Sequence, residues 1–498
     1  MNPDRAPVIV GIGEVLDRSA ADRAGLPVLE LIAAAVQAAG RDAGAQGWVE
    51  ATDWLGVVDA LSWERRPEPI HPALSARLAI APRIAASSPS PSGNYPIRLL
   101  EDAANAIAAG EAEVAIVAGG EAMRSFARNR PPDAGRNGTA VISGYRAAQE
   151  SDLLQRYAIL APIDVYPLYE QATRHAWGQT LAEANAESGA IWAGNARVAA
   201  DNPYAWIRQP RAADEIVTPS PANPMLSFPY TRLMVANSGV NQAAAVIVTS
   251  AGRARRMGIA EDRLVHVGHG AAADEAQGNL ERANFTASPA MTAVLQATLE
   301  RNAVTVADLD HVELYSCFPC VPKMARRVIG WPLDRPHSIY GGLTFGGGPI
   351  GNCMTHAVAA LVRRLREGSR AGLVFGNGGF ATRNHAIVLT RNAPATPRQP
   401  RDYDVQAQAD AQRGAIPPLL ADHVGPGWIE SYLVPHRGGV PAQATVVART
   451  AAGARFLAGV PGSDGATLAW LTNGAVEPVG TPGAGRMGPD GLVEWHRA

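Results

Sequence analysis

The residues that could do chemistry in this chain gather in two short segments. Tyr315, Cys317 and Cys320 stand close together, and Cys353 and His356 follow further along. A tyrosine hydroxyl can donate a hydrogen bond to an oxyanion or, once ionised, act as a base. Thiols and imidazoles can move protons or bind a metal. The two segments therefore predict a site for acid–base or metal chemistry.

The three cysteines and the histidine also form the pattern C-x2-C followed by C-x2-H, with Cys317 and Cys320 in the first part and Cys353 and His356 in the second. These ligand types and spacings would suit zinc. The first pair, however, encloses Phe-Pro at the predicted end of a strand, unlike a zinc knuckle. We predict that no metal is bound and keep zinc as the alternative. For His356 a catalytic role and a capping or buried role both stay open.

Between the two segments lies a glycine-rich stretch, Gly341–His356, with six glycines and one proline. Glycine and proline oppose helix propagation, so this stretch predicts a loop whose backbone can approach a ligand closely. The hydrophobic run His311–Phe318 comes before it and an amphipathic helix follows it. A second glycine turn, Gly376–Phe380, follows the next predicted strand. Loops of this kind place the reactive side chains at the ends of strands.

Strands and helices alternate along most of the chain, which is typical of an α/β fold. We expect an N-terminal half over residues 1–250 and a C-terminal half over 251–391, with a similar order of elements. Residues 124–230 predict an inserted subdomain or lid. The Pro-rich segment 392–404 predicts a linker.

Residues 405–498 predict a small β-barrel. Short β-like runs separated by turn residues carry this expectation: Gly427–Val434, Ala442–Ala448, Arg455–Val460 and Thr467–Thr472. The domain has few aromatic residues and no basic stripe, which argues against binding of single-stranded nucleic acid. We expect it to pack on the main body or to seal a pocket there.

The composition argues against several classes of function. The 498 residues are 47% hydrophobic and 18% charged, with a formal net charge of −2. No basic excess points to nucleic acid, and no apolar run predicts a membrane span or a signal peptide. Three cysteines argue against a disulfide framework and fit the cytoplasm.

Four segments in order resemble the thiolase superfamily: Ile107–Met123, Ala236–Val248, Val312–Phe318 and Gly341–Asn352. The C-terminal part resembles the additional, OB-like domain of the thiolase-like proteins of type 1. The resemblance implies a duplicated, five-layer αβαβα thiolase fold and an acetyl-CoA acetyltransferase-like protein. It further implies a coenzyme A thioester as substrate or ligand, no covalently bound cofactor and a possible homodimer.

The chain departs from the family at each catalytic loop. Aligning the segment before Ile107 places Gly93 where the family has its nucleophilic cysteine, with Ser90 and Ser92 as weak alternatives. The family's Gly-His-Pro appears as Gly347-Gly348-Pro349. Its second catalytic cysteine corresponds to Gly376 in Gly376-Asn377-Gly378. These losses predict that the protein does not run the covalent, ping-pong thiolase reaction.

The remaining candidates follow from the same resemblance. Tyr315 takes the place of a residue that holds the catalytic water, with Cys317 at the edge of the site and His356 facing it. The expected pocket loops contain Gly93, Ser316, Gly347, Gly348, Asn352, Gly376, Asn377 and Gly378. We expect a non-covalent C–C lyase or transferase acting on acyl-CoA, such as a retro-aldolase. The alternative is an inactive thiolase fold that binds acyl-CoA or a partner protein.

Overall fold

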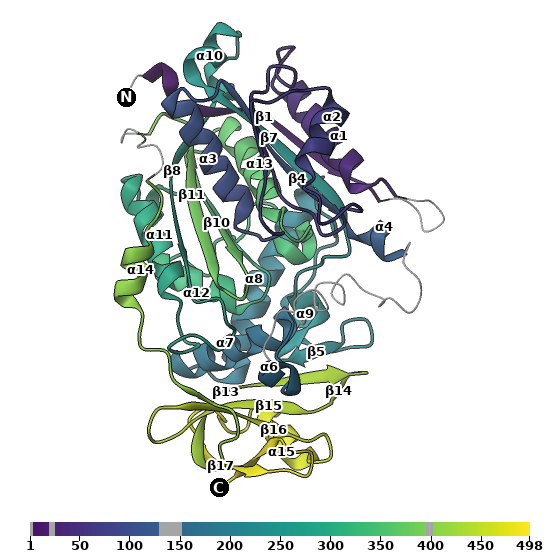
Figure 1. Ribbon diagram of the computed structural model, residues 1–498, viewed down its shortest axis with the longest axis vertical. Coiled ribbons are helices and arrows are strands. Elements are labelled where there is room, and N and C mark those ends of the chain that lie inside the picture. The colour runs from purple at the N-terminus through teal and green to yellow at the C-terminus, as the bar shows by residue number, and fades with distance from the viewer. Residues whose placement is uncertain (1–2, 19–24, 129–151, 395–397, 399–401) are drawn as a thin grey trace.

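The structure, a computed structural model, describes residues 3–18, 25–128, 152–394, 398 and 402–498. Figure 1 shows an α/β body at one end, a group of helices beneath it and a small β domain at the other end. The predicted insertion 124–230 and the predicted linker 392–404 lie partly outside the described residues. The predicted domain boundaries stay predictions.

Within the described residues, nine strands form one sheet in the order β3-β2-β4-β7-β1-β8-β11-β10-β9. The central strands are buried along nearly their whole length, which explains their continuous apolar runs. The strands are β1 (Pro7–Leu16), β2 (Trp54–Val57), β3 (Ile84–Ser87), β4 (Val114–Ala122), β7 (Asn241–Ser250), β8 (Val265–Asp274), β9 (His311–Leu314), β10 (Ala371–Gly378) and β11 (Arg383–Thr390).

The sheet consists of two halves with the same topology, so the predicted duplication is confirmed. The order β2-β4-β7-β1 in the first half repeats as β9-β10-β11-β8 in the second. The directions match as well, with one parallel and two antiparallel pairings in each. The halves meet where Val8 and Ile9 pair with His266 and Val265. This arrangement brings corresponding loops of the two halves toward one region.

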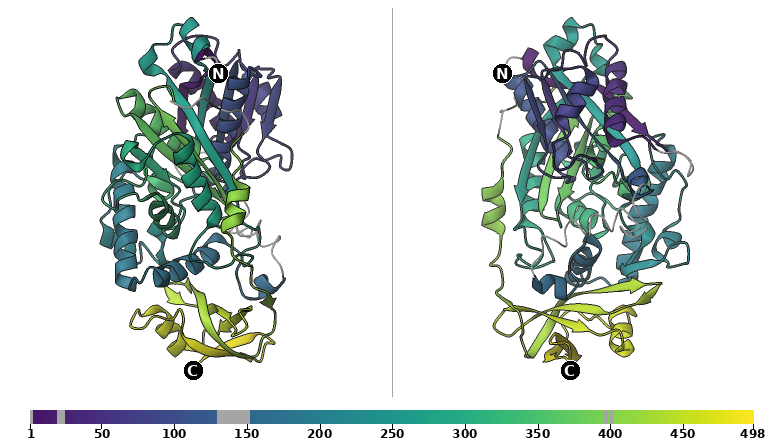
Figure 2. Two further views of the ribbon diagram at one scale, coloured as in Figure 1. Left: turned by 90° about the vertical axis from the view of Figure 1, so that its left-hand side faces the viewer. Right: turned by 45° about the vertical axis from the view of Figure 1, so that its right-hand side comes forward.

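Helices pack on the strands of both halves, which Figure 2 shows in two further views, and complete the predicted five layers. Helices α3 and α13 pack against strands of both halves and form the central layer. Helix α1 covers the outer face of the first half, and α11 that of the second. The helices are α1 (Val28–Asp42), α2 (His71–Leu78), α3 (Tyr95–Ala109), α10 (Ala251–Arg256), α11 (Pro289–Arg301), α12 (Cys320–Ile329) and α13 (Cys353–Arg366).

The insertion contributes helices that lie between the body and the C-terminal domain (Figure 1). Helix α8 begins at a capping box, in which the Thr180 side chain accepts from the Glu183 amide while Glu183 accepts from the Thr180 amide. The elements are α4 (Met123–Arg128), α6 (Asp152–Arg156), α7 (Pro162–Ala176), α8 (Leu181–Asp201), α9 (Ala213–Val217), β5 (Met225–Phe228) and β6 (Tyr230–Thr231).

The C-terminal domain is a barrel, as predicted. Five of its described strands close in the order β13-β15-β16-β18-β17-β13, and β5 of the insertion adds to β13 outside the barrel. The elements are α14 (Gln406–Gln412), β12 (Leu419–Leu420), β13 (Gly425–Arg437), β14 (Val440–Pro441), β15 (Ala444–Arg449), β16 (Arg455–Val460), α15 (Gly465–Thr472), β17 (Pro482–Met487) and β18 (Val493–Arg497).

One predicted strand of this domain is wrong. Thr467–Thr472 lies in helix α15 because Asp464 caps the helix and accepts a hydrogen bond from the Thr467 amide at 3.0 Å. Leu468 and Leu471, three residues apart, then face the barrel core together. The capping residue, rather than the apolar run, determines that this segment forms a helix.

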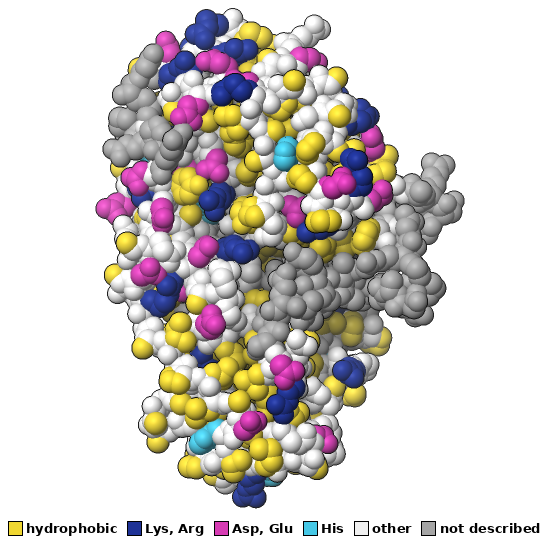
Figure 3. All heavy atoms as spheres, in the orientation of Figure 1, with side chains coloured by type: hydrophobic (Ala, Val, Ile, Leu, Met, Phe, Trp, Pro, Cys, Tyr) yellow, Lys and Arg dark blue, Asp and Glu magenta, His cyan; other side chains and the backbone are white. Residues whose placement is uncertain are grey.

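Charged side chains of both signs are mixed on one face of the molecule. On the face drawn in Figure 3, basic side chains alternate with acidic ones instead of forming a continuous patch. In the part of the chain that the structure describes, no helix is long and apolar enough to cross a membrane.

Candidate functional site

A cavity of about 110 Å³ lies where loops from both halves and the insertion meet. It is lined by the loop before α3 (Pro91–Gly93), by α7 (Pro162 and Tyr166), by the segment before β7 (Ala236 and Ser238), by the segment after β9 (Tyr315, Cys317 and Phe318), by the glycine loop (Leu343, Gly348 and Ile350) and by the region at the end of β10 (Asn377–Gly379). A larger hollow of about 640 Å³ is built from residues 37–50 alone, beside α1. We place the candidate site in the smaller cavity, because segments that are distant in the sequence converge there.

Six of the predicted residues line the cavity: Gly93, Tyr315, Cys317, Gly348, Asn377 and Gly378. The other predicted pocket residues lie behind this lining and hold its loops: Ser316, Gly347, Asn352 and Gly376. The Ser316 hydroxyl accepts from the Leu343 amide at 3.1 Å, and Asn352 donates to the Gly119 carbonyl at 2.6 Å.

Gly93 and Tyr315 are in direct contact, and this contact defines the site. A Cβ atom added at Gly93 would lie 2.4 Å from the Tyr315 hydroxyl and 2.6 Å from the Asn377 carbonyl oxygen. Real Cβ contacts are not that short. The tyrosine ring thus fills the space into which a side chain at position 93 would point, and no nucleophile fits there beside it.

Helix α3 begins at Tyr95, two residues after Gly93, so its N-terminus faces this corner of the cavity. At this terminus the Tyr95 amide donates to the Ser92 carbonyl at 3.1 Å and Pro96 has no N–H, so α3 offers the positive end of its dipole rather than free amide donors. An oxygen that gains negative charge in the cavity would be stabilised there.

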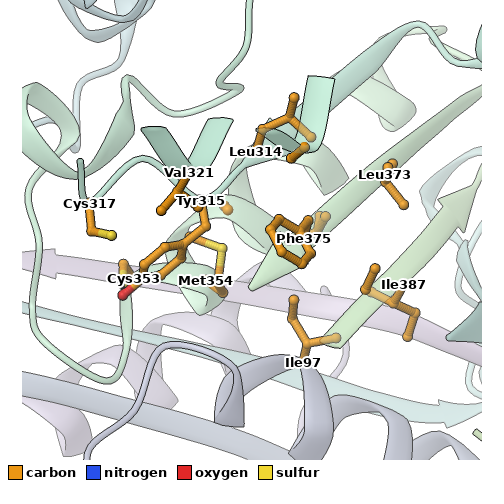
Figure 4. Close-up of a cluster of buried hydrophobic side chains, with 14 of the residues drawn as sticks. Ile97, Leu314, Tyr315, Cys317, Val321, Cys353, Met354, Leu373, Phe375 and Ile387 are labelled. Carbon is orange, nitrogen blue, oxygen red and sulfur yellow. Dashed lines mark hydrogen bonds between the residues drawn. The ribbon is translucent and has the colours of Figure 1, made fainter. Parts of the chain in front are cut away.

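The Tyr315 hydroxyl is a neutral donor. Burial raises the pKa of Tyr315 well above its ordinary value, and the neighbouring Cys353 thiol adds to this effect. Figure 4 shows the hydroxyl beside Cys353, whose sulfur donates to it over a long 4.0 Å. The proton of the hydroxyl stays available for a ligand. Of the two roles considered for Tyr315, the structure supports donation to an oxyanion and argues against a phenolate base.

A buried carboxyl group anchors the glycine loop. Glu313 Oε2 accepts from the Ser338 hydroxyl at 2.6 Å and from the Ile339 amide at 3.0 Å. Ser338 in turn accepts from the amides of Gly341 and Gly342 at 3.0 and 2.7 Å. The loop then makes a π-helical turn over Gly342–Gly346.

After this turn the loop passes close to another buried side chain. Gly347 has φ of 109°, and a Cβ there would lie 2.0 Å from Gln242 Oε1. The family's histidine corresponds to the next residue, Gly348, whose added Cβ would lie 3.2 Å from the Leu343 carbonyl. Ile350, a β-branched residue of the lining, has a strained φ of 40°. The loop is thus held in one conformation that L side chains rarely adopt.

Burial raises the pKa of Glu313 to about 8. Between pH 5 and 8 the folded protein therefore keeps a proton that the unfolded chain has lost, and this group lowers the free energy of unfolding as the pH rises. The slope approaches about 1.4 kcal/mol per pH unit. We expect Glu313→Gln to lose less stability than the wild type between pH 5 and 8, measured by urea unfolding.

Glu30→Gln is the control for this comparison. The pKa of Glu30 is lowered by its hydrogen bond with Arg77, so this group titrates below that pH range. Its replacement should leave the slope between pH 5 and 8 unchanged. Equal slopes for wild type and Glu313→Gln would contradict the assignment of a protonated Glu313.

His356 does not line the cavity, so of the two roles left open by the sequence the structure shows the buried one. Its Nδ1 lies 2.6 Å from Glu14 Oε1 of β1, and the ring is buried. Glu14 also pairs with Arg363 of α13. His356 therefore joins the central helix layer to the first strand, and we leave it out of the proposed chemistry.

The zinc alternative finds no geometric support. In the described part of the chain, no three His, Cys, Asp or Glu side chains are placed to hold a metal ion. The Cys320 thiol points to the Tyr166 carbonyl at 3.7 Å, while His356 contacts Glu14. All three cysteines are buried and form no disulfide.

The two alternative serines also lack the partners of a nucleophile. The Ser92 hydroxyl donates to Asn94 Oδ1 at 2.8 Å, and an amide oxygen is no base. Ser90 accepts from Arg383 at 3.4 Å and is absent from the lining.

The sequence predicted the insertion as a subdomain or lid, but not which of its residues line the cavity. Tyr166 of α7 stacks on Phe318 with ring centres 4.5 Å apart and an angle of 19°. The aromatic residues of Val165–Gly178 were a visible signal, but nothing in their spacing indicated which of them reaches the cavity.

Comparisons with known proteins agree with this architecture. Residues 404–491 match the family model of the thiolase-like protein type 1 additional C-terminal domain. The crystal structure of a monomeric SCP2-thiolase like protein type 1 from Mycobacterium smegmatis is similar over 100% of both chains, with 27% identity and a TM-score of 0.83. The predicted resemblance is confirmed.

Other solved thiolase folds are more distant. The Ltp2-ChsH2(DUF35) aldolase is 20% identical with a TM-score of 0.60, over 78% of this chain and 98% of that one. Human mitochondrial 3-ketoacyl-CoA thiolase is 15% identical with a TM-score of 0.58, over 78% and 99%. At these identities the similarity shows the thiolase fold alone. No curated protein matches the chain.

Proposed function

We propose that this thiolase-like protein binds a short-chain acyl-CoA thioester with the acyl group in the cavity and acts on it without a covalent acyl-enzyme. The contact between Gly93 and Tyr315 carries this proposal, because a tyrosine donor stands where a nucleophile would need space. The cavity of about 110 Å³ is small beside the roughly 300–1,000 Å³ of pockets for drug-sized ligands, so it suits a short acyl group.

The proposed reaction is retro-aldol cleavage of a β-hydroxyacyl-CoA. The hydroxyl proton leaves to water, the Cα–Cβ bond breaks, and its electron pair forms the enolate of the remaining thioester. Tyr315 donates a hydrogen bond to the enolate oxygen, and the α3 N-terminus adds positive potential. The carbonyl compound forms as the Cα–Cβ bond breaks, and the proton taken up by water returns to Cα to give the shorter acyl-CoA. A related thiolase fold described as an aldolase supports this choice.

A second function is binding of acyl-CoA without turnover. Among the described residues of the lining there is no histidine or carboxylate that could serve as a general base. A general base contributes about 10²- to 10⁴-fold to a rate, so cleavage at this site should be slow.

Calorimetry and product analysis with a short β-hydroxyacyl-CoA test both functions. We expect binding, slow release of a carbonyl product and an unchanged protein mass in an intact-mass spectrum. A mass increase by the acyl group would overturn the non-covalent mechanism. Binding without product would select the binding function, and no binding would overturn both.

The assembly state is also a proposal. The similar protein from Mycobacterium smegmatis is described as monomeric, which supports a monomer here over the predicted homodimer.

A further inference from the structure

Helix α7 forms a wall of the cavity and also contacts the C-terminal barrel. Pro162 and Tyr166 face the cavity. The Leu168 carbonyl, two residues beyond Tyr166, accepts a hydrogen bond of 2.6 Å from the hydroxyl of Ser431 on β13. Because α7 both lines the cavity and packs on β13, it lies between the cavity and the barrel (Figure 1).

Tyr166 closes the cavity on this side. Its ring stacks on Phe318, and its hydroxyl donates to the Gly379 carbonyl and accepts from the Ala381 amide, both at 3.3 Å. The ring is almost fully buried. It therefore reaches from the insertion to the turn after β10 and limits the length of any group held against Tyr315.

The space behind Tyr166 is polar and charged. Glu170, one turn further along α7, pairs with Lys323 at 2.6 Å and accepts from the Tyr230 hydroxyl at 2.9 Å. Both members of the ion pair are buried. An alkyl chain pushed past Tyr166 would have to separate these groups, which is costly in a dry interior. The end of the cavity is thus set by α7.

The barrel holds α7 and its surroundings by further contacts. Thr445 of β15 donates to the Tyr157 carbonyl at 2.8 Å, shortly before α7 begins. Strand β13 pairs with β5 of the insertion through Val434 and Phe228. Tyr230 follows β5 after Pro229, and its ring packs on Phe318 with ring centres 5.3 Å apart. Two sets of contacts therefore connect the barrel to Tyr166 and Phe318, the aromatic residues that line the cavity on this side.

We propose that the C-terminal barrel sets the acyl length that the cavity admits, by holding α7 so that Tyr166 closes it. The substrate class is CoA thioesters with short acyl chains. This inference rests on the proposed function, since it concerns the same cavity. It assigns the additional domain a role in specificity rather than in chemistry.

The test measures affinity, by calorimetry, for saturated acyl-CoAs of two to ten carbons, which lack the β-hydroxyl group needed for cleavage. Each buried methylene contributes about 0.8 kcal/mol, or roughly fourfold in affinity. We expect the wild type to favour short chains. Tyr166→Ala and the milder Tyr166→Leu should raise the affinity for octanoyl-CoA relative to butyryl-CoA at least tenfold.

Ser431→Ala tests whether the barrel affects chain-length preference, because Ser431 lies in the barrel and does not line the cavity. Loss of its hydrogen bond to α7 should raise the affinity for octanoyl-CoA relative to butyryl-CoA about threefold or more. A control in the same domain should leave the ratio unchanged. Thr472→Ala removes a hydrogen bond within α15, away from α7 and the cavity.

The outcomes separate the two proposals. A ratio that Ser431→Ala leaves unchanged, with a shift in Tyr166→Ala, would overturn the role of the barrel. Unchanged ratios in the Tyr166 variants, with CoA esters still bound, would overturn Tyr166 as the limiting residue. If no CoA ester binds to any variant, the proposed function fails and this inference fails with it.

Discussion

Tyr315→Phe should lower the rate of cleavage about 10²- to 10³-fold while changing the affinity for the CoA ester little. The hydroxyl is the buried neutral donor of the cavity, and loss of one oxyanion donor typically has an effect of this size. Its interaction strengthens as negative charge develops, so kcat should fall and KM should stay nearly constant. Steady-state kinetics on the β-hydroxyacyl-CoA would measure this.

Tyr340→Phe is the matched control. Tyr340 is buried nearby and donates to the Gly347 carbonyl at 3.2 Å, but it does not line the cavity. The same chemical change there should lower stability by about 1 kcal/mol and alter kcat far less. Full activity in Tyr315→Phe would rule out Tyr315 as the donor to the enolate.

Lys323→Met should lower the free energy of unfolding by about 3–5 kcal/mol. Lys323 of α12 is fully buried, and its ammonium group contacts Glu170 Oε1 at 2.6 Å and the Ala184 carbonyl at 2.9 Å. Removing it leaves a buried carboxylate with the Tyr230 hydroxyl as its remaining partner. An uncompensated buried charge is strongly destabilising. Urea unfolding, followed by tryptophan fluorescence, measures the loss.

The double variant Glu170→Gln, Lys323→Met should recover most of that stability, because it removes both charges. Arg77→Met, which breaks an ion pair on the surface with Glu30, should change stability little. A Lys323→Met protein as stable as the wild type would show that Glu170 takes up a proton or reaches water in the folded state.

Local signals in the sequence were sufficient for much of the fold. Ser288 followed by Pro289 is an N-cap signal that a single sequence displays, and in the structure the Ser288 side chain accepts from the Met291 amide at the start of α11. Alternating strands and helices predicted the duplicated body. These features depend on periodicity and capping, which act over a few residues and are visible in one sequence.

The candidate site was predicted only in part, because its geometry depends on distant contacts. His356 was expected to face the pocket, but its partner is Glu14, which is far away in the sequence. The position of Tyr166 depends on an insertion whose packing no local pattern describes. Gly93 was identified by comparison with the family, yet only the structure reveals that Tyr315 occupies its side-chain space.

The contact between Gly93 and Tyr315 also makes the two positions interdependent. A cysteine introduced at position 93 would collide with the tyrosine ring, because its Cβ would lie 2.4 Å from the Tyr315 hydroxyl. A smaller residue at position 315 would make room for it but would remove the hydroxyl group from the cavity. A side chain at position 93 and a tyrosine at position 315 therefore exclude each other, and a nucleophile can be introduced here only by changing both positions.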